Sequence, residues 1–439
     1  MKKRYALPIL ILILIPGLTL AQARWTLEQC IDHAWKNNLK IKQQEISVEQ
    51  NENNLTQAKL NFAPSVRASL SHSMNWGRSV NVQDLEIIEN KLSQSTSASA
   101  SAAINLFEGM VKHNDIKSKN VVLEISKKEV DRIKNDISIE ITRSFLQILL
   151  SKEVLNTAIE SQNSVKQQVD RTKKLVDAGS LAYSALLEIE AQLASESVQV
   201  VNASNQLSTA KLNLAQLLDL EDVYNFEIDE KPIDIPLSDL SPSSVEEMYH
   251  TSQDLPQIQS SILNIKNSDL QLAIARGRAF PSISFSAGYG TYYADSRDQS
   301  FFDQFNENKN PSLSFGLSIP IFNNYQVRTS IKNAKLGVRS AQIEHKSRQQ
   351  MLYKEIQQAN NDALSYLQRY LASQKSVDAM KESFRYVQEK FDLGVVNAID
   401  YTVAKTNLFR AQSELIQSKY QYMFQVKILD FYKGLPISL

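Results

Sequence analysis

Few residues in this chain have the type and spacing that chemistry at an active site requires. There is one cysteine, Cys30, so the sequence offers no disulfide framework and no pair of thiols for a metal or redox centre. The five histidines are scattered, and no phosphate-binding glycine loop, nucleophile elbow or HExxH motif occurs. The acidic residues are spread along predicted helix surfaces without an obvious acid–base pair. We therefore expect no enzyme, no cofactor and no bound metal.

The composition instead predicts long, uninterrupted elements. Only 11 glycines and 11 prolines occur in 439 residues, about half the usual share of each. Apolar residues make up 43% of the chain, which is enough for a sizeable core. The 48 basic residues balance the 48 acidic ones, so the basic footprint of a protein that binds nucleic acid is absent and we expect no such partner.

The N-terminus has the features of an export signal. Three basic residues at positions 2–4 precede the nearly all-apolar residues 5–20, and a small-x-small cleavage sequence follows at 21–23. We predict a cleavable signal peptide over residues 1–23 rather than a membrane anchor, because prolines and a glycine interrupt a run already short for a spanning helix. Cleavage leaves 45 basic against 48 acidic residues. Cys30 lies too far past the cleavage site for a lipid-modified first residue, so we expect a buried thiol and not a lipoprotein.

The mature chain is a tandem repeat. Similar segments recur in the same order at offsets of 217 and 215, as in Pro64 with Pro281, and Asp177-Ala178-Gly179 with Asp392-Leu393-Gly394. We place the first repeat at residues 24–220 and the second at 244–439. Residues 221–243, which are acidic and carry three prolines, form the predicted linker. Each repeat has one order of elements: helix, strand, loop, strand, very long helix, tight turn and long helix.

Four segments alternate between apolar and small polar residues. They are residues 65–77, 95–107, 282–293 and 312–322. Alternation over about ten residues fits a tilted membrane-spanning strand with lipid on one side and water on the other. It also fits a soluble hairpin with one buried face. The export signal, and aromatic residues near the strand ends such as Trp76 and Tyr292, favour the membrane strand.

Four strands cannot close into a membrane barrel alone, because the smallest such barrels need about eight and an open edge in lipid leaves backbone groups unpaired. Two copies would give eight strands and an interior filled by side chains, whereas three would give twelve and room for water. Small inward residues such as serine and glycine favour an open lumen. We therefore expect a homotrimer.

The remaining length belongs to long helices. Residues 109–176 and 325–393 are almost free of proline and glycine, and each would reach about 100 Å at about 1.5 Å per residue. Their apolar residues recur at 3-4 spacing, which is typical of helices packed against neighbours. Helices over residues 185–218 and 399–433 are expected to return antiparallel after glycine turns.

Together these features resemble the TolC family of outer-membrane efflux and export channels. The paired turns are part of the resemblance: Leu175-Val176-Asp177-Ala178-Gly179-Ser180-Leu181 and Phe391-Asp392-Leu393-Gly394-Val395-Val396. The resemblance implies a mainly α fold, with four strands per chain in a trimeric twelve-stranded outer-membrane barrel and a long α-helical barrel across the periplasm. It implies an exit duct of a tripartite efflux or type I secretion system. The implied partners are outer-membrane lipid, a periplasmic adaptor (membrane fusion) protein and an inner-membrane transporter.

The resemblance also implies a gate at the tip of the helices. The acidic constriction rings of the family's best-studied member align with Asp400 and Val403. Three copies of Asp400 would form an acidic ring that selects cations, and three of Val403 would add an apolar constriction. Helix N-capping by Asp400 is an equally weighted alternative. The family's Tyr, Arg and Asp latch cannot form, because the aligned positions read Phe391, Val396 and Ala185.

The tip turns are the candidate docking site for the adaptor. The residues concerned are Asp177, Gly179, Ser180, Leu181, Asp392, Gly394, Val395 and Val396. For the two aspartates, chain reversal and docking are comparable roles, and both glycines are expected to supply a positive φ at a helix end.

An alternative function is a structural or adhesive trimeric coiled-coil surface protein without a conducting pore. The long helices favour it, but it predicts no alternating strands and no paired hairpins.

Overall fold

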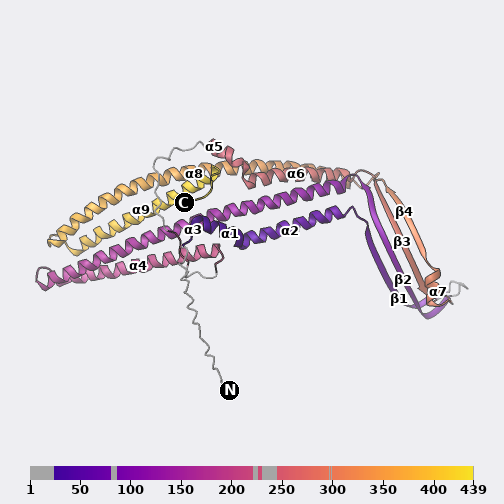
Figure 1. Ribbon diagram of the computed structural model, residues 1–439, viewed down its shortest axis with the longest axis horizontal. Coiled ribbons are helices and arrows are strands. Elements are labelled where there is room, and N and C mark those ends of the chain that lie inside the picture. The colour runs from indigo at the N-terminus through magenta and orange to yellow at the C-terminus, as the bar shows by residue number, and fades with distance from the viewer. Residues whose placement is uncertain are drawn as a thin grey trace, which may run out of the picture.

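The computed structural model describes residues 24–80, 87–220, 226–229, 245–295, 297 and 299–438. The molecule is elongated, with a bundle of long helices and a small sheet at one end that is inclined to the bundle (Figure 1). The turns between the longest helices lie at the opposite end from the sheet. The predicted signal peptide and most of the predicted linker lie outside the described residues.

The two repeats contain matching elements. The first contains α1 (Leu27–Asn37), α2 (Leu39–Leu60), β1 (Ser65–Val80), β2 (Ile87–Glu108), α3 (Val111–Asp177) and α4 (Tyr183–Leu217). The second contains α5 (Val245–Thr251), a 3-10 turn (Ser252–Asp254), α6 (Pro256–Gly277), β3 (Ser282–Ala294), α7 (Phe301–Glu307), β4 (Asn310–Ser318), α8 (Gln326–Asp392) and α9 (Ala398–Tyr432). α3 and α8 have 67 residues each, and α4 and α9 have 35 each. The mainly α fold with a duplicated element order is confirmed.

The four strands form one antiparallel sheet in the order β1-β2-β3-β4. Pairing of β2 with β3 joins the two repeats, and β1 and β4 are the free edges. Because side chains alternate along a strand, the apolar residues share one face, and they are exposed, with Val66 and Phe315 each 76% exposed. Serines line the other face, where the Oγ atoms of Ser69 and Ser99 lie 2.8 Å apart. The sheet thus has one apolar and one hydroxyl-rich face.

The strand boundaries differ most from the predicted ones at the start of β2 and the end of β4. β2 begins at Ile87 instead of near residue 95, because it stays paired with β1 through a stretch that lacks clean alternation. β4 ends at Ser318 instead of residue 322, since Pro320 has no N–H to donate to a strand ladder. The predicted outer loop 79–94 is therefore largely strand where described, and the second one, residues 294–311, contains α7.

The largest apolar core lies midway along the bundle, where α1 packs against α3. Cys30 is fully buried there beside residues such as Leu27 and Ile141. Burial raises the pKa of the Cys30 thiol to about 12. The predicted buried thiol is confirmed.

Candidate functional site

The turn between α3 and α4 is a Schellman motif. The Gly179 N–H donates to the Val176 carbonyl at 2.9 Å, and the Ser180 N–H donates to the Leu175 carbonyl at 2.8 Å. Gly179 has a φ of +73°, which a residue with a side chain rarely adopts. The positive φ predicted for Gly179 is therefore present, and Asp177 is exposed at the helix end.

The turn between α8 and α9 repeats this geometry 215 positions later. Gly394 has a φ of +70° and donates to the Phe391 carbonyl at 3.0 Å, and Val395 donates to the Lys390 carbonyl at 2.9 Å. A Cβ added at Gly394 would lie 4.0 Å from the Cδ2 atom of Leu181. The two tip turns therefore lie side by side, with Val396 partly buried behind them against the tip core.

The aspartates of the two turns, equivalent in sequence, have different surroundings. The Asp392 carboxylate lies 3.0 Å from Arg171 Nη1 and accepts a hydrogen bond from Gln168 Nε2 at 3.3 Å. Both partners are on α3, so these contacts join the α8/α9 hairpin to the α3/α4 hairpin. The Asp392 side chain is only 14% exposed and that of Arg171 is 55% exposed. Sequence reasoning missed this link, since no local pattern relates residues more than 220 positions apart.

An aromatic cluster lies behind the two turns. Phe391 and Tyr401 are almost fully buried, with ring centroids 5.2 Å apart. They pack with Val165 of α3 and Ile189 of α4, so this core spans both hairpins. Burial raises the pKa of Tyr401 to about 12. At a position that aligns with the family's polar latch, Phe391 thus supplies apolar packing instead.

Asp400 and Val403 lie one helical turn apart on α9, and both are exposed, Val403 to 53%. The N-cap of α9 is Asn397, whose Oδ1 accepts the Asp400 N–H at 2.8 Å. The predicted alternative, N-capping by Asp400, is therefore wrong. The Asp400 carboxylate does lie in the first turn of α9, where an acidic group is favoured. The Asn-x-x-Asp spacing of residues 397–400 in the sequence already indicated that Asn397 could be the N-cap of this helix.

A buried lysine lies one turn further along α9. Lys405 is 8% exposed, and its Nζ lies 4.9 Å from the centroid of the Phe384 ring. Burial lowers the pKa of Lys405, opposed by the charge of Glu196 on α4. Glu196 is 4% exposed and accepts a hydrogen bond from Gln192 at 2.8 Å. This pair of opposite charges between the hairpins was not predicted, although Lys405 lies on the buried stripe of Tyr401 and Leu408.

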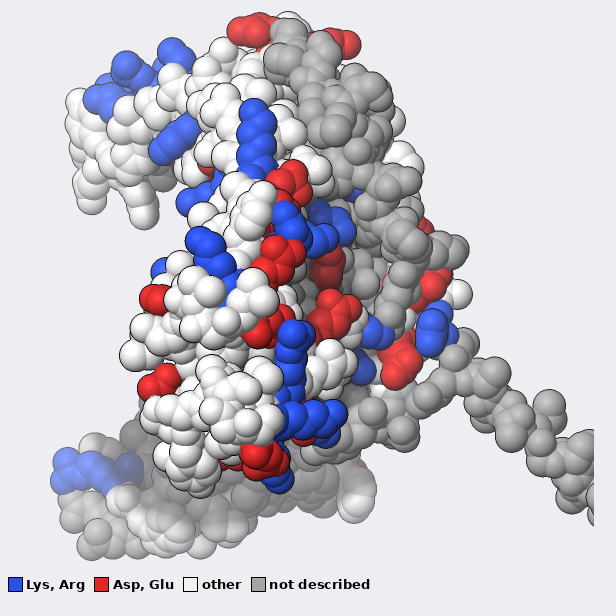
Figure 2. Space-filling model, turned by 90° about the vertical axis from the view of Figure 1, so that its left-hand side faces the viewer, with Lys and Arg blue, Asp and Glu red and all other residues white. Residues whose placement is uncertain are grey.

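The outer surface of the tip exposes several large apolar side chains. Leu393 is 79% exposed, Val395 68% and Ile399 60% beside the second turn, and Tyr183 is 64% exposed beside the first. Figure 2 looks onto this end of the molecule and shows uncharged surface with basic and acidic side chains beside it. Apolar side chains this exposed suit contact with another protein.

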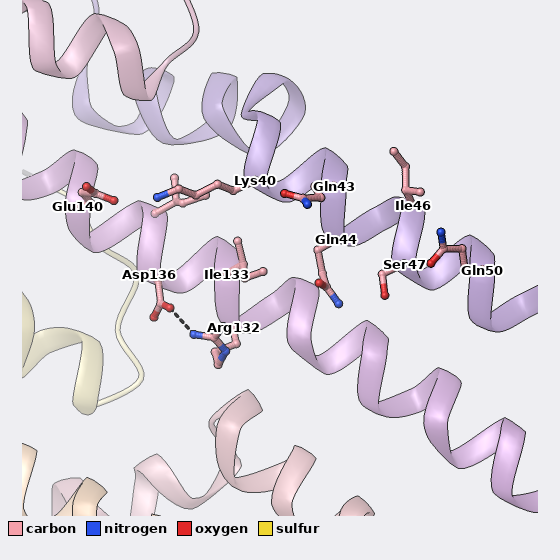
Figure 3. Close-up of a pocket in the computed structure, with 11 residues that line it drawn as sticks. Lys40, Gln43, Gln44, Ile46, Ser47, Gln50, Arg132, Ile133, Asp136 and Glu140 are labelled. Atoms are coloured by element: carbon pink, nitrogen blue, oxygen red, sulfur yellow. Dashed lines mark hydrogen bonds and ion pairs between the residues drawn. The ribbon is translucent and has the colours of Figure 1, made fainter.

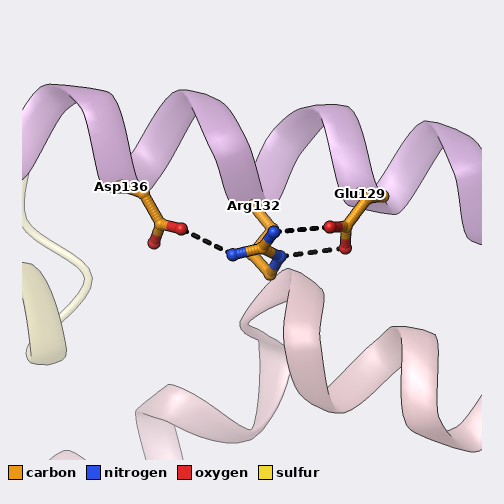
Figure 4. Close-up of polar contacts among 3 residues, drawn as sticks. All are labelled: Glu129, Arg132 and Asp136. Atoms are coloured by element: carbon orange, nitrogen blue, oxygen red, sulfur yellow. Dashed lines mark hydrogen bonds and ion pairs between the residues drawn. The ribbon is translucent and has the colours of Figure 1, made fainter. Parts of the chain in front are cut away.

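A separate cavity of about 760 Å³ lies between α2 and α3 (Figure 3). Its charged wall includes Arg132, which donates from Nε to Glu129 at 2.9 Å and from Nη1 to Asp136 at 2.5 Å (Figure 4). The hydrogen bond to Glu129 is the main cause of the raised pKa of Arg132. The Arg132 guanidinium is thus bound by acidic side chains of its own helix. Among the described residues no group of three or more His, Cys, Asp or Glu could hold a metal ion.

Within the described part of the chain, no helix combines the length and apolar character needed to cross a membrane.

Comparison with known proteins gives relatives over most of the chain. The family model described as outer membrane efflux protein matches residues 30–219 and 249–434. Outer membrane protein TolC of Escherichia coli (strain K12) is 21% identical over 296 residues, which cover 64% of this chain and 57% of that protein. TolC of Vibrio cholerae serotype O1 is 19% identical over 290 residues, covering 66% and 65%. The aligned part of the chain thus spans less than two thirds of the length of either relative.

Solved structures share the fold over nearly the whole chain. The Campylobacter jejuni CmeC outer membrane channel has a TM-score of 0.77 at 18% identity, covering 93% of this chain and 85% of that one. The Vibrio cholerae outer membrane protein VceC has a TM-score of 0.75 at 13% identity, covering 94% and 97%. The resemblance to the TolC family is confirmed, and the family model covers both repeats and the tip turns. This chain belongs to the family of outer membrane efflux proteins.

Proposed function

We propose that this protein is the outer-membrane exit duct of a tripartite efflux or type I secretion system. The observation that carries the proposal is that one chain presents one sheet face suited to lipid and another suited to water. The sheet exposes an apolar face and a hydroxyl-rich face, and helices of about 100 Å extend from it. Such a molecule suits lipid around the sheet, water within it and a long path across the periplasm.

The named relatives support the same class of function. One is a proteases secretion protein, PrtF, of Dickeya chrysanthemi, and another is a cation efflux system protein, CusC, of Escherichia coli O6:H1. In our proposal the transporter of the inner membrane supplies the energy, a periplasmic adaptor connects it to this chain, and no chemical step falls to this chain. The apolar tip around Leu393 and Val395 would dock the adaptor.

The open sheet supports the proposed trimer. Among the described strands, β1 and β4 each have one unpaired edge, and closure by copies of the same chain would place β4 of one copy beside β1 of the next. Three copies would make twelve strands with the serine face inside, wide enough for water. The coiled-coil alternative finds no support, since the chain has the paired hairpins that this alternative lacks.

The gate in this proposal is at the tip. Asp400 and Val403 share an exposed face of α9, and in a ring of three they would form an acidic and an apolar constriction. The Arg171–Asp392 pair would hold the two hairpins of each chain in the closed arrangement.

The mass of the purified protein and its conductance in planar bilayers test the proposed duct. The purified protein should have the mass of a trimer in detergent and should form cation-selective channels in planar bilayers. Asp400→Ala should raise the single-channel cation conductance or relieve block by cations, whereas Asp177→Ala at the other turn should leave both unchanged. A monomer, or a trimer without conductance, would refute the duct. Unchanged conductance and selectivity in Asp400→Ala would refute only the gate.

A further inference from the structure

The two free edges of the sheet differ in length. β1 has 16 residues and β4 has nine. In a closed ring of identical copies, β4 must lie beside β1 of the next copy, because β2 and β3 already have neighbours on both sides. Even if all of β4 pairs, seven residues of β1 are left over, which is about 23 Å at about 3.3 Å per residue. Natural proteins cover such bare edges.

The chain already covers one bare edge with α7. β3 continues to Ala294, but its ladder with β4 ends at Gly290. The side-chain amide of Gln304 accepts the Ala294 N–H at 3.1 Å and donates to the Ala294 carbonyl at 3.0 Å. Asn308 Nδ2 donates to the Tyr292 carbonyl at 2.8 Å. Gln304 is fully buried, so α7 and its C-cap residue Asn308 replace the missing β4 residues with side-chain amides.

The rest of α7 presents an aromatic cluster. The Phe301 ring lies 5.0 Å from that of Tyr293, which belongs to the apolar row of β3. It stacks on Phe305 at 5.0 Å and meets Phe302 edge-on at 5.5 Å. Phe302 is 81% exposed, more than the other aromatic residues of this cluster. α7 therefore holds one phenylalanine ring outward from a rigid base.

Chain direction determines which part of a neighbour α7 can reach. α7 lies at the outer end of the sheet (Figure 1). It binds the edge of β3 that continues past β4, so β2 and β3 separate it from β1 of its own chain. β1 runs from the helices outward, so its later residues lie at that same outer end. Two apolar side chains in that half are exposed, Met74 to 46% and Trp76 to 75%. They belong to the apolar row of β1, the same sheet face on which the Phe301 ring meets Tyr293.

We propose that α7 of one protomer clasps the outer half of β1 in the next, with Phe302 packed against Trp76 and Met74 of the partner subunit. The occupant of this surface is a second copy of the chain, and the inference rests on the trimer proposed above. Aromatic pairs of this kind add to the stability of an interface beyond the area they bury. The clasp closes the seam between subunits where β4 is too short to do so.

Thiol cross-linking in the intact protein tests the contact. Phe302→Cys combined with Trp76→Cys, treated with a short bis-maleimide, should give covalent species up to three chains on a denaturing gel. Each single variant should stay monomeric there, and native Cys30 is buried and does not interfere. The matched control is Glu307→Cys with Trp76→Cys, because Glu307 is exposed on α7 and points about 140° around the helix from Phe302, and this pair should not link chains.

The trimer's heat resistance gives a second readout. Phe302→Ala should lower the temperature at which trimers dissociate in detergent, whereas Glu307→Ala should not. If trimers of native mass form but the Phe302/Trp76 pair links no chains, α7 faces lipid or water and the clasp is overturned while the duct stands. If no trimer forms in the unmodified protein, both fail.

Discussion

Breaking the contact between Arg171 and Asp392 should open the closed tip. Asp392→Asn keeps the shape of the side chain and removes its charge, so the ion pair to Arg171 Nη1 at 3.0 Å is lost. The hydrogen bond from Gln168 at 3.3 Å can persist. The substitution therefore weakens the seam between the hairpins without altering the core around Phe391 and Tyr401.

The magnitude follows from the burial of the pair. Asp392 is 14% exposed and Arg171 55%, between the exposed pairs that contribute up to about 1 kcal/mol and the buried charged hydrogen bonds that contribute about 1.5–3 kcal/mol. Because solvent screens the exposed side of Arg171, we take the contribution of this ion pair to the closed tip as about 1 kcal/mol per chain. Three seams that open together then amount to about 3 kcal/mol, which raises the ratio of open to closed channels roughly 100-fold.

Single-channel recording in planar bilayers measures this ratio as the fraction of time in the high-conductance state. Asp177→Asn is the matched control, since Asp177 occupies the equivalent turn and is exposed. Arg171→Ala should open the channel to a similar degree, and the double variant should add little to either single one. The reasoning is refuted if Asp392→Asn stays as closed as the wild type, if Asp177→Asn opens equally, or if the effects of the two single variants add in full.

The remaining predictions concern stability and reactivity. Gly394→Ala should cost about 1 kcal/mol of unfolding free energy in a melting experiment, because of its φ of +70°, whereas Gly337→Ala inside α8 should be neutral or stabilising. The lowered pKa of Lys405 means that the unfolded chain binds more protons, so the free energy of unfolding should rise with pH from that pKa toward 10. Lys405→Met should flatten this slope in denaturant titrations. Cys30, with a pKa of about 12, should resist maleimide at pH 8 until the protein unfolds.

The long elements could be predicted because their causes are local. Scarcity of glycine and proline determines where helices can run unbroken, and the structure has α3 and α8 at 67 residues each. The duplication made each half a check on the other, so the two glycine turns were found together. Alternation predicted which face of each strand is apolar. These signals depend on neighbours within a few positions, and they need no knowledge of the tertiary structure.

Other features depend on contacts between distant segments. β2 extends to Ile87 because β1 is beside it, which no pattern within residues 87–94 indicates. α7 forms against the bare end of β3, where Gln304 finds the Ala294 backbone. The partners of Asp392 and Lys405 lie on the other hairpin, so only the packed structure brings these charges together.

The tip explains how a polar link can persist when the family's latch residues are absent. Adjacent residues on a helix point about 100° apart, so Phe391 and Asp392 face different neighbours. Phe391 faces Tyr401 within its own hairpin and fills the core. Asp392 faces α3, where Arg171 and Gln168 bind it. The apolar position thus fills a core that also includes Val165 and Ile189 of the other hairpin, while the next residue adds a polar contact between the hairpins. Because that contact is half-buried and charged, it separates into water at lower cost than the aromatic core behind it, and we expect the tip of the proposed duct to open first at this contact.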